Sequence, residues 1–350
     1  MLCYSHTLLE QIFPYFSLTL RLLFLTDDRE DYLSDGLLHG LRQLPWLELV
    51  DYPRKECMYE GGRQCKVAPR FGVRGGGFNL YGFLTEPEGG IDRSFIWQRL
   101  AAGWFDAVLL SNLWRQWGLL MQWRELLAKQ PLLMLDGDDD QRLYPRSGTR
   151  FRQFGIGTGL TNLLQLPSTH IFKRELTNRS RKWGLKLNIH PLAFSIPDSQ
   201  ILMHLPNKSQ LFPSHIVDLD LSNKLGASTN YVFADEHSYR SDLVSSRFGI
   251  TTRRAGWDCL RHYEIAAAGA VICFRDLEQK PVSCAPHGLI EGLNCISYRS
   301  SDELLNRMDK LSDQQELELQ NSALDWAHQS STVNRALECL RLAGLTALHI

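Results

Sequence analysis

The chain has 350 residues, enough for two domains of ordinary size, and its 44% hydrophobic and 22% charged residues are typical of a globular protein with a substantial core. The formal net charge of −1 excludes an overall field that would favour nucleic acid or an anionic membrane, so we expect no nucleic-acid partner. Eight cysteines are scattered without a Cys-x-x-Cys pair, which argues against a zinc site and favours reduced thiols and a cytoplasmic location.

Residues 8–25 are fairly apolar, but Pro14 and Arg21 interrupt the segment. It lacks the basic segment and the small-residue cleavage site of a signal peptide, and it is too polar to span a bilayer. We therefore expect residues 1–19 to form an irregular N-terminal extension. A peripheral membrane contact through residues 12–25 is the alternative, since amphipathic anchors can be this weakly apolar.

Short apolar runs alternate with helical patterns in the first half of the chain. Residues 32–44 place Leu37 and Leu41 on one helical face, and a second helix is expected at 113–128. Strands that alternate with helices imply a parallel sheet covered on both faces. The glycine-rich segment 61–90 is expected to be either a functional loop or a disordered insertion. The expected strands are residues 21–26, 47–52, 106–111 and 131–135.

The composition changes at residues 155–168, where a run interrupted by glycines suits a connection between domains. We place a first Rossmann-like domain at residues 20–168 and a second at residues 169–330. From residue 246 onward the pattern is strand, helix, strand, strand, helix, and residues 337–350 have the pattern of an amphipathic helix.

Two short patterns between residues 155 and 182 do not point to a specific function. Gly155-x-Gly157-x-Gly159 lacks the GxGxxG spacing of a dinucleotide site, so a nicotinamide-dependent enzyme is disfavoured and no cofactor is expected. The basic cluster of Lys173, Arg174, Arg179, Arg181 and Lys182 fits a solvated face, and contact with a diphosphate or an acidic acceptor is the alternative.

The most informative segment is residues 260–298. Arg261 and Glu264 are three apart and share one helical face, and the alanines that follow allow the helix to pack closely on a sheet. Gly269 is suited to end this helix, because it adopts the left-handed conformation without steric cost. The polar, basic loop at 251–256 precedes the helix, and the free N–H groups at a helix start favour an anion.

This order of residues resembles the donor-binding half of GT-B glycosyltransferases, in particular the family-1-like group related to spore-maturation-type glycosyltransferases. The resemblance covers residues 254–335. It implies an α/β fold of two Rossmann-like domains that face a cleft, with residues 331–350 packing back on the first domain. The matching residues are Arg261, Glu264, Ala266, Ala268, Gly269 and Ala270, followed by Arg275 and Asp276, a strand at 292–298 and a helix start at 301–304.

The implied activity is transfer of a sugar from a nucleotide-sugar donor to the hydroxyl of an unidentified acceptor, without a divalent metal. By the resemblance, Glu264 binds the ribose hydroxyls, and Arg261 with one of two neighbouring arginines balances the diphosphate. Many GT-B enzymes carry another glutamate eight residues earlier, where this chain has Gly256, so a non-catalytic nucleotide-sugar-binding protein is the alternative. The implied donor-binding residues are Arg253, Arg254, Gly256, Arg261, Glu264 and Gly269.

Two groups of polar residues in the first half are further candidates. The acidic run Asp136–Asp140 follows an expected strand and supports either cleft lining, which we favour, or a metal-dependent transferase. A haloacid-dehalogenase phosphatase would need Thr or Val at Asp140. Asp35 and His39 share a helical face in the acceptor-side domain and are candidate bases, although an exposed helix pair is the favoured interpretation.

Overall fold

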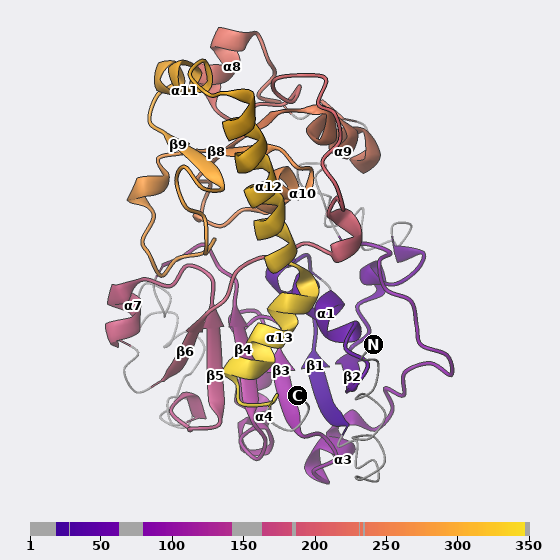
Figure 1. The fold of residues 1–350 in the computed structure, drawn as a ribbon. Coiled ribbons are helices and arrows are strands. Elements are labelled where there is room, and N and C mark those ends of the chain that lie inside the picture. The colour runs from indigo at the N-terminus through magenta and orange to yellow at the C-terminus, as the bar shows by residue number, and fades with distance from the viewer. Residues whose placement is uncertain are drawn as a thin grey trace, which may run out of the picture.

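Two separate parallel sheets form the framework of the protein, for which the computed structural model describes residues 19–27, 29–62, 80–141, 163–183, 187–230, 232–233 and 235–346. The first has the order β2-β1-β3-β4-β5-β6, and the second has the order β7-β8-β9 (Figure 1). Helices cover both sheets, which confirms the predicted α/β fold of two Rossmann-like units. The strands are β1 (Leu20–Leu25), β2 (Leu47–Tyr52), β3 (Ala107–Leu110), β4 (Leu132–Asp136), β5 (Thr169–Lys173), β6 (Asn188–Pro191), β7 (Phe248–Thr252), β8 (Val271–Arg275) and β9 (Cys295–Tyr298).

The first sheet is buried on both faces, as its continuous apolar strands require. Along β1, Leu22 and Phe24 contribute to one core, together with residues of α1 (Tyr32–Arg42) and α13 (Thr332–Leu342). Leu23 and Leu25 contribute to the other core, with residues of α3 (Ile96–Ala101) and α4 (Trp117–Leu127). Because side chains alternate along a strand, one apolar run supplies both layers.

The predicted helix at 113–128 begins four residues late, at Trp117. The side-chain oxygen of Asn112 accepts hydrogen bonds from the N–H groups of Trp114 (3.1 Å) and Arg115 (3.0 Å), and this local turn competes with the helix. The turn matters for the site, because it places Arg115 at the edge of the sheet where the strands end.

The second unit contains α8 (Leu219–Leu225), α9 (Glu236–Ser245), α10 (Leu260–Ala267), α11 (Ser301–Met308) and α12 (Asp313–Gln329). Helices α10 and α12 pack on each other, with the rings of Tyr263 and Trp326 stacked 4.9 Å apart. The remaining elements are α7 (Asn178–Trp183) and the 3₁₀ turns Glu56–Met58, Asp198–Gln200 and Leu277–Gln279. No helix in the described part of the chain is long and apolar enough to cross a membrane.

The C-terminal helix α13 lies against α1 of the first unit (Figure 1). A side chain at Gly40 would place its Cβ 1.9 Å from the carbonyl oxygen of Thr332, so only glycine permits this approach of the two helices. The chain crosses between the units twice, near Ile196 and near Ser331, and the two crossings lie side by side. The N–H group of Thr332 donates to the carbonyl of Ile196 (3.0 Å), and the N–H group of Ile196 donates to the carbonyl of Ser330 (3.3 Å).

The prediction that the second domain begins at residue 169 is wrong for the sheet. Strand β5 pairs with β4 from Thr169 to Lys173, and β6 pairs with β5, so both strands extend the first sheet. The change of composition at 155–168 therefore precedes another strand of the first unit. Of the other predicted segments, residues 1–18, 63–79 and 142–162 lie outside the described residues.

Candidate functional site

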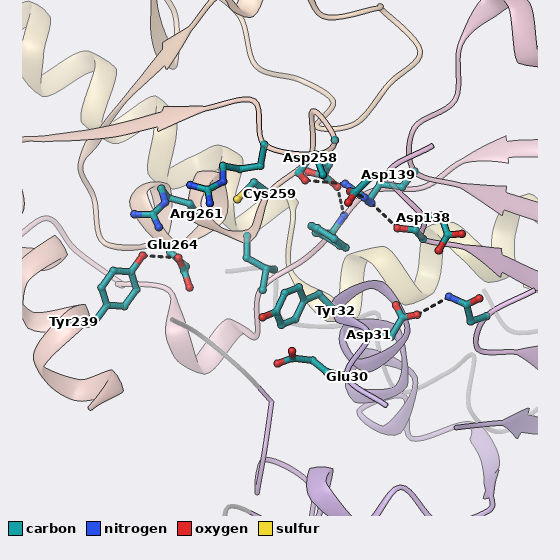
Figure 2. A pocket seen from close by; sticks show the side chains of 18 of the residues that line it. Glu30, Asp31, Tyr32, Asp138, Asp139, Tyr239, Asp258, Cys259, Arg261 and Glu264 are labelled. Atoms are coloured by element: carbon teal, nitrogen blue, oxygen red, sulfur yellow. Dashed lines mark hydrogen bonds and ion pairs between the residues drawn. The ribbon is translucent and has the colours of Figure 1, made fainter. Parts of the chain in front are cut away.

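A cavity of about 570 Å³ lies between the two units, at the carboxyl ends of the strands of the first sheet and at the start of α10 (Figure 2). This edge is where α/β folds place their ligands, because loops from several strands converge there. The first unit contributes Glu30, Asp31, Tyr32, Asn112, Arg115, Asp138, Asp139 and Arg174 to the lining. The second unit contributes His215, Thr229, Asn230, Tyr239, and most of the segment from Arg254 to Glu264.

Four of the predicted donor-binding residues line this cavity: Arg254, Gly256, Arg261 and Glu264. Glu264 accepts a hydrogen bond of 2.6 Å from the hydroxyl of Tyr239 on α9 (Figure 2). Burial, followed by the neighbouring charge of Glu264, raises the pKa of Tyr239 well above its usual value, so this hydroxyl remains a donor. A carboxylate has about four acceptor positions, so Tyr239 orients Glu264 without using its full capacity.

Arg254 and Arg261 form the cationic part of the cavity. Neither guanidinium forms an ion pair with any carboxylate of the described residues. Burial and then the charges of Arg261 and Arg254 lower the pKa of His215, so its ring is neutral near pH 7. Two arginines that form no ion pair with the described carboxylates, beside a neutral histidine, are suited to bind a multiply charged anion.

Two predicted donor-binding residues lie elsewhere. The guanidinium of Arg253 lies over the ring of Trp257, 5.0 Å from its centroid, and lines a separate hollow with Arg275. Gly269 ends α10 with φ +64°, outside the cavity, and a Cβ there would lie 2.5 Å from a methyl carbon of Leu205. Gly269 terminates the helix, as its position in the sequence predicted, and it does not line the cavity.

Two N–H groups of the loop before α10 are bonded to the other unit and are therefore not among the free donors that the sequence suggested. The N–H groups of Trp257 (2.8 Å) and Asp258 (3.1 Å) both donate to one carboxylate oxygen of Glu175, which follows β5 in the first unit. A Cβ at Gly256 would lie 2.5 Å from that oxygen and 2.8 Å from a carboxylate oxygen of Asp139. Glycine is therefore required at position 256 because two carboxylates of the other unit occupy the space of a side chain.

Arg174 completes this contact between the units. Its guanidinium donates to the carbonyl of Asp258 (2.7 Å), to Glu175 (3.2 Å) and to Asp139, and it lies over the ring of Phe194. Its side chain is only 2% exposed, so the prediction of a solvated basic face at this position is wrong. Local patterns could not predict this contact, because Glu175 and Trp257 are 82 residues apart.

The candidate bases are not at the cavity. Asp35 is buried and pairs with Lys55, and burial raises the pKa of its carboxyl to about 6. The Nδ1 atom of His39 lies 2.9 Å from the hydroxyl oxygen of Thr332 in the interface between α1 and α13, and burial lowers its pKa to about 4. Their shared helical face points into the interior, so neither an acceptor base nor an exposed pair describes them.

The acidic run is divided between the interior and the cavity. Asp136 is fully buried and forms an ion pair of 2.9 Å with Lys173, and burial raises its pKa to about 6. Asp138 and Asp139 line the cavity, as the cleft-lining interpretation expects. Asp139 is bound by Arg174. No group of three or more His, Cys, Asp or Glu side chains in the described part of the chain is arranged to hold a metal ion.

The arrangement as a whole is that of the GT-B architecture, in which two Rossmann-like units face a cleft. No family model and no curated protein matches the chain. Among solved structures, the Anabaena protein HepE in complex with UDP-glucose is similar to the chain, with a TM-score of 0.52 and 11% identity over 93% of this chain and 99% of that one. A glycosyltransferase from Rickettsia africae has a TM-score of 0.51 and 10% identity, over 93% and 98%. At these identities the likeness establishes the fold.

Proposed function

We propose that the protein transfers a sugar from a nucleotide-sugar donor to an acceptor hydroxyl without a divalent metal. The observation that carries the proposal is the grouping of Arg254, Arg261 and Glu264 on one wall of the cavity between the units. A nucleoside diphosphate offers a strong anion beside two vicinal ribose hydroxyls, and these are the partners that two arginines and one carboxylate satisfy.

In the proposed reaction, the bond between the anomeric carbon and the diphosphate oxygen breaks, and its electron pair leaves with the nucleoside diphosphate. The acceptor oxygen forms the new bond to the anomeric carbon, and the proton of the acceptor hydroxyl is released. Arg254 and Arg261 stabilise the negative charge that grows on the diphosphate, which is where preorganised cations lower a barrier most effectively. Glu264, oriented by Tyr239, accepts hydrogen bonds from the ribose.

The finer assignments are also part of the proposal. We place the chain in the family-1-like group related to spore-maturation-type glycosyltransferases on the basis of the residue pattern at 254–335. We place the protein in a reducing compartment, the cytoplasm, because each cysteine that the structure describes is a free thiol: Cys57, Cys259, Cys273, Cys284, Cys295 and Cys339. The N-terminal unit is proposed to bind the acceptor.

Two alternatives lead to different expectations. A non-catalytic protein would bind nucleotide sugars through the same residues and never release free sugar or product. A metal-dependent transferase would use the acidic run, but Asp136 is paired with Lys173 and Asp139 with Arg174, so two of its carboxylates already have cationic partners.

The test is a panel of nucleotide sugars, read by donor hydrolysis and by transfer to a set of hydroxyl acceptors, with and without EDTA. We expect turnover that survives EDTA. In parallel, Glu264→Gln should weaken donor binding by about 1.5–3 kcal/mol, the range for a hydrogen bond to a charged group. Binding without turnover across the panel supports the non-catalytic alternative, and activity restored only by Mn²⁺ supports the metal-dependent one. Unchanged donor affinity in a folded Glu264→Gln protein contradicts the proposed site.

A further inference from the structure

The two walls of the cavity differ in their balance of charges. The second unit contributes two arginines, Arg254 and Arg261, and two carboxylates, those of Asp258 and Glu264. Across the cavity, the first unit contributes four carboxylates but only two arginines (Figure 2). The four carboxylates are those of Glu30, Asp31, Asp138 and Asp139.

The two arginines of the acidic wall already have carboxylate partners. Arg115 lies 3.5 Å from Asp31 and 3.7 Å from Asp27, and it also donates to the carbonyl of Glu30 (3.1 Å). Arg174 is held by Asp139 and by the buried Glu175, which does not line the cavity. Each arginine thus pairs with one carboxylate of this wall and with one carboxylate outside it. The net charge of the wall is therefore negative.

Asp138 stands out within this wall. It is half-buried at the end of β4, and its carboxylate forms no hydrogen bond or ion pair with the described residues. Burial raises the pKa of Asp138, because a desolvated carboxylate lacks the hydrogen bonds that water would supply. A ligand hydroxyl that donates to this carboxylate would replace those hydrogen bonds.

This difference between the walls would orient a donor. If a diphosphate binds to Arg254 and Arg261, the sugar attached to it would face the wall that carries Asp138 and Asp139 (Figure 2). Sugar hydroxyls are hydrogen-bond donors that suit carboxylates. A carboxylate or phosphate on the sugar would instead meet like charge in a partly dehydrated cavity, where Coulomb interactions are stronger than in water.

On the basis of the proposed function, we infer that the transferred sugar is an uncharged polyhydroxyl ring recognised by Asp138, and that donors carrying a uronic acid or a phosphorylated sugar are rejected. This assigns a substrate class and a specificity-determining residue to the first unit. Specificity of this kind combines an attractive contact for the right ligand with a repulsive one for the wrong ligand.

The test compares donors that differ only in the charge of the sugar. Calorimetry with UDP, UDP-glucose and UDP-glucuronate, and with GDP, GDP-mannose and GDP-mannuronate, isolates the contribution of the sugar, because the base and diphosphate cancel within each set. In the set whose diphosphate binds, we expect the neutral donor to bind at least tenfold more tightly than the uronate, which corresponds to about 1.4 kcal/mol. Asp138→Asn should reduce this ratio to about threefold or less, because the amide removes the charge and keeps the shape.

Glu125→Gln is the matched control, because Glu125 is 89% exposed on α4 and does not line the cavity. It should leave the ratio unchanged. Equal affinity for the neutral and uronate donors, or an unaltered ratio in folded Asp138→Asn, overturns the inference while leaving the proposed function intact, provided that Arg261→Ala still weakens diphosphate binding. If no nucleotide of either set binds, the proposed function fails and the inference fails with it.

Discussion

Glu175 is the residue whose replacement tests the contact between the two units most directly. One of its carboxylate oxygens accepts hydrogen bonds from the N–H groups of Trp257 and Asp258 and from Arg174. Glu175→Ala leaves two buried N–H groups without partners, at about 1–3 kcal/mol each, and removes a carboxylate from a buried arginine. Breaking a buried ion pair from one side costs about 3–5 kcal/mol. Because these effects overlap, we expect a total loss of about 3–5 kcal/mol in the free energy of unfolding.

Glu175→Gln separates geometry from charge. All three of these hydrogen bonds use the same oxygen of Glu175, and an amide oxygen in that position still accepts them. The amide weakens only the charge-assisted part, so we expect a loss of about 1–2 kcal/mol. Because the loop leads directly into α10, which carries Arg261 and Glu264, Glu175→Ala should also weaken donor binding.

The measurement is urea denaturation followed by circular dichroism, with donor affinity determined by calorimetry on the folded variants. Glu125→Ala, at an exposed position of α4, serves as the control and should shift stability by less than about 0.5 kcal/mol. A loss of less than about 1 kcal/mol in the free energy of unfolding of Glu175→Ala would refute the reasoning, because two buried N–H groups without acceptors should destabilise the protein by more than that. Equal losses in the Ala and Gln variants would show that charge, and not the shared acceptor geometry, stabilises the loop.

Two other positions give independent predictions. Arg254→Ala should weaken nucleoside diphosphate binding by about 1.5–3 kcal/mol, because Arg254 lines the cavity. The adjacent Arg253→Ala removes a side chain that lies over Trp257, and it should change the affinity by less than about twofold. Equal effects of the two substitutions in titration calorimetry would contradict the assigned geometry. His39 is neutral in the folded protein, where burial lowers its pKa to about 4, but it binds a proton below about pH 6.5 when unfolded. The unfolded state therefore holds more protons between pH 4 and 6.5, and stability falls with acidification over that interval, by roughly 2 kcal/mol from pH 7 to pH 5 for this group. Denaturation at several pH values should show a shallower decline in His39→Gln, and an unchanged slope would show that His39 does not titrate as described.

Local sequence patterns were sufficient to predict the strands and helices that surround the site. The apolar run at residues 22–25 is typical of a strand that is covered on both faces, and the structure places its residues in two cores. The segment with Arg261, Glu264 and Gly269 has helix spacing, a terminator and a following strand, and α10 and β8 appear in that order. Such features depend on residues a few positions apart, so the sequence displays them directly.

Local patterns could not predict the surroundings of residues whose neighbours come from distant parts of the sequence. Asp35 and His39 looked alike from spacing alone, and only the positions of Lys55 and α13 show that both are buried. The boundary at residue 169 failed for the same reason, because membership of a sheet depends on the neighbouring strand and not on local composition.

By itself the sequence determined the alternation of strands and helices, and the helical face that presents Arg261 and Glu264. The tertiary structure alone decided that Glu175 accepts hydrogen bonds from the loop before α10, that Gly256 makes room for two carboxylates, and that Asp138 lies across the cavity from Arg261. The physical reason is that period and helix ends are properties of neighbouring residues, whereas burial and charge pairing are properties of segments brought together by the fold.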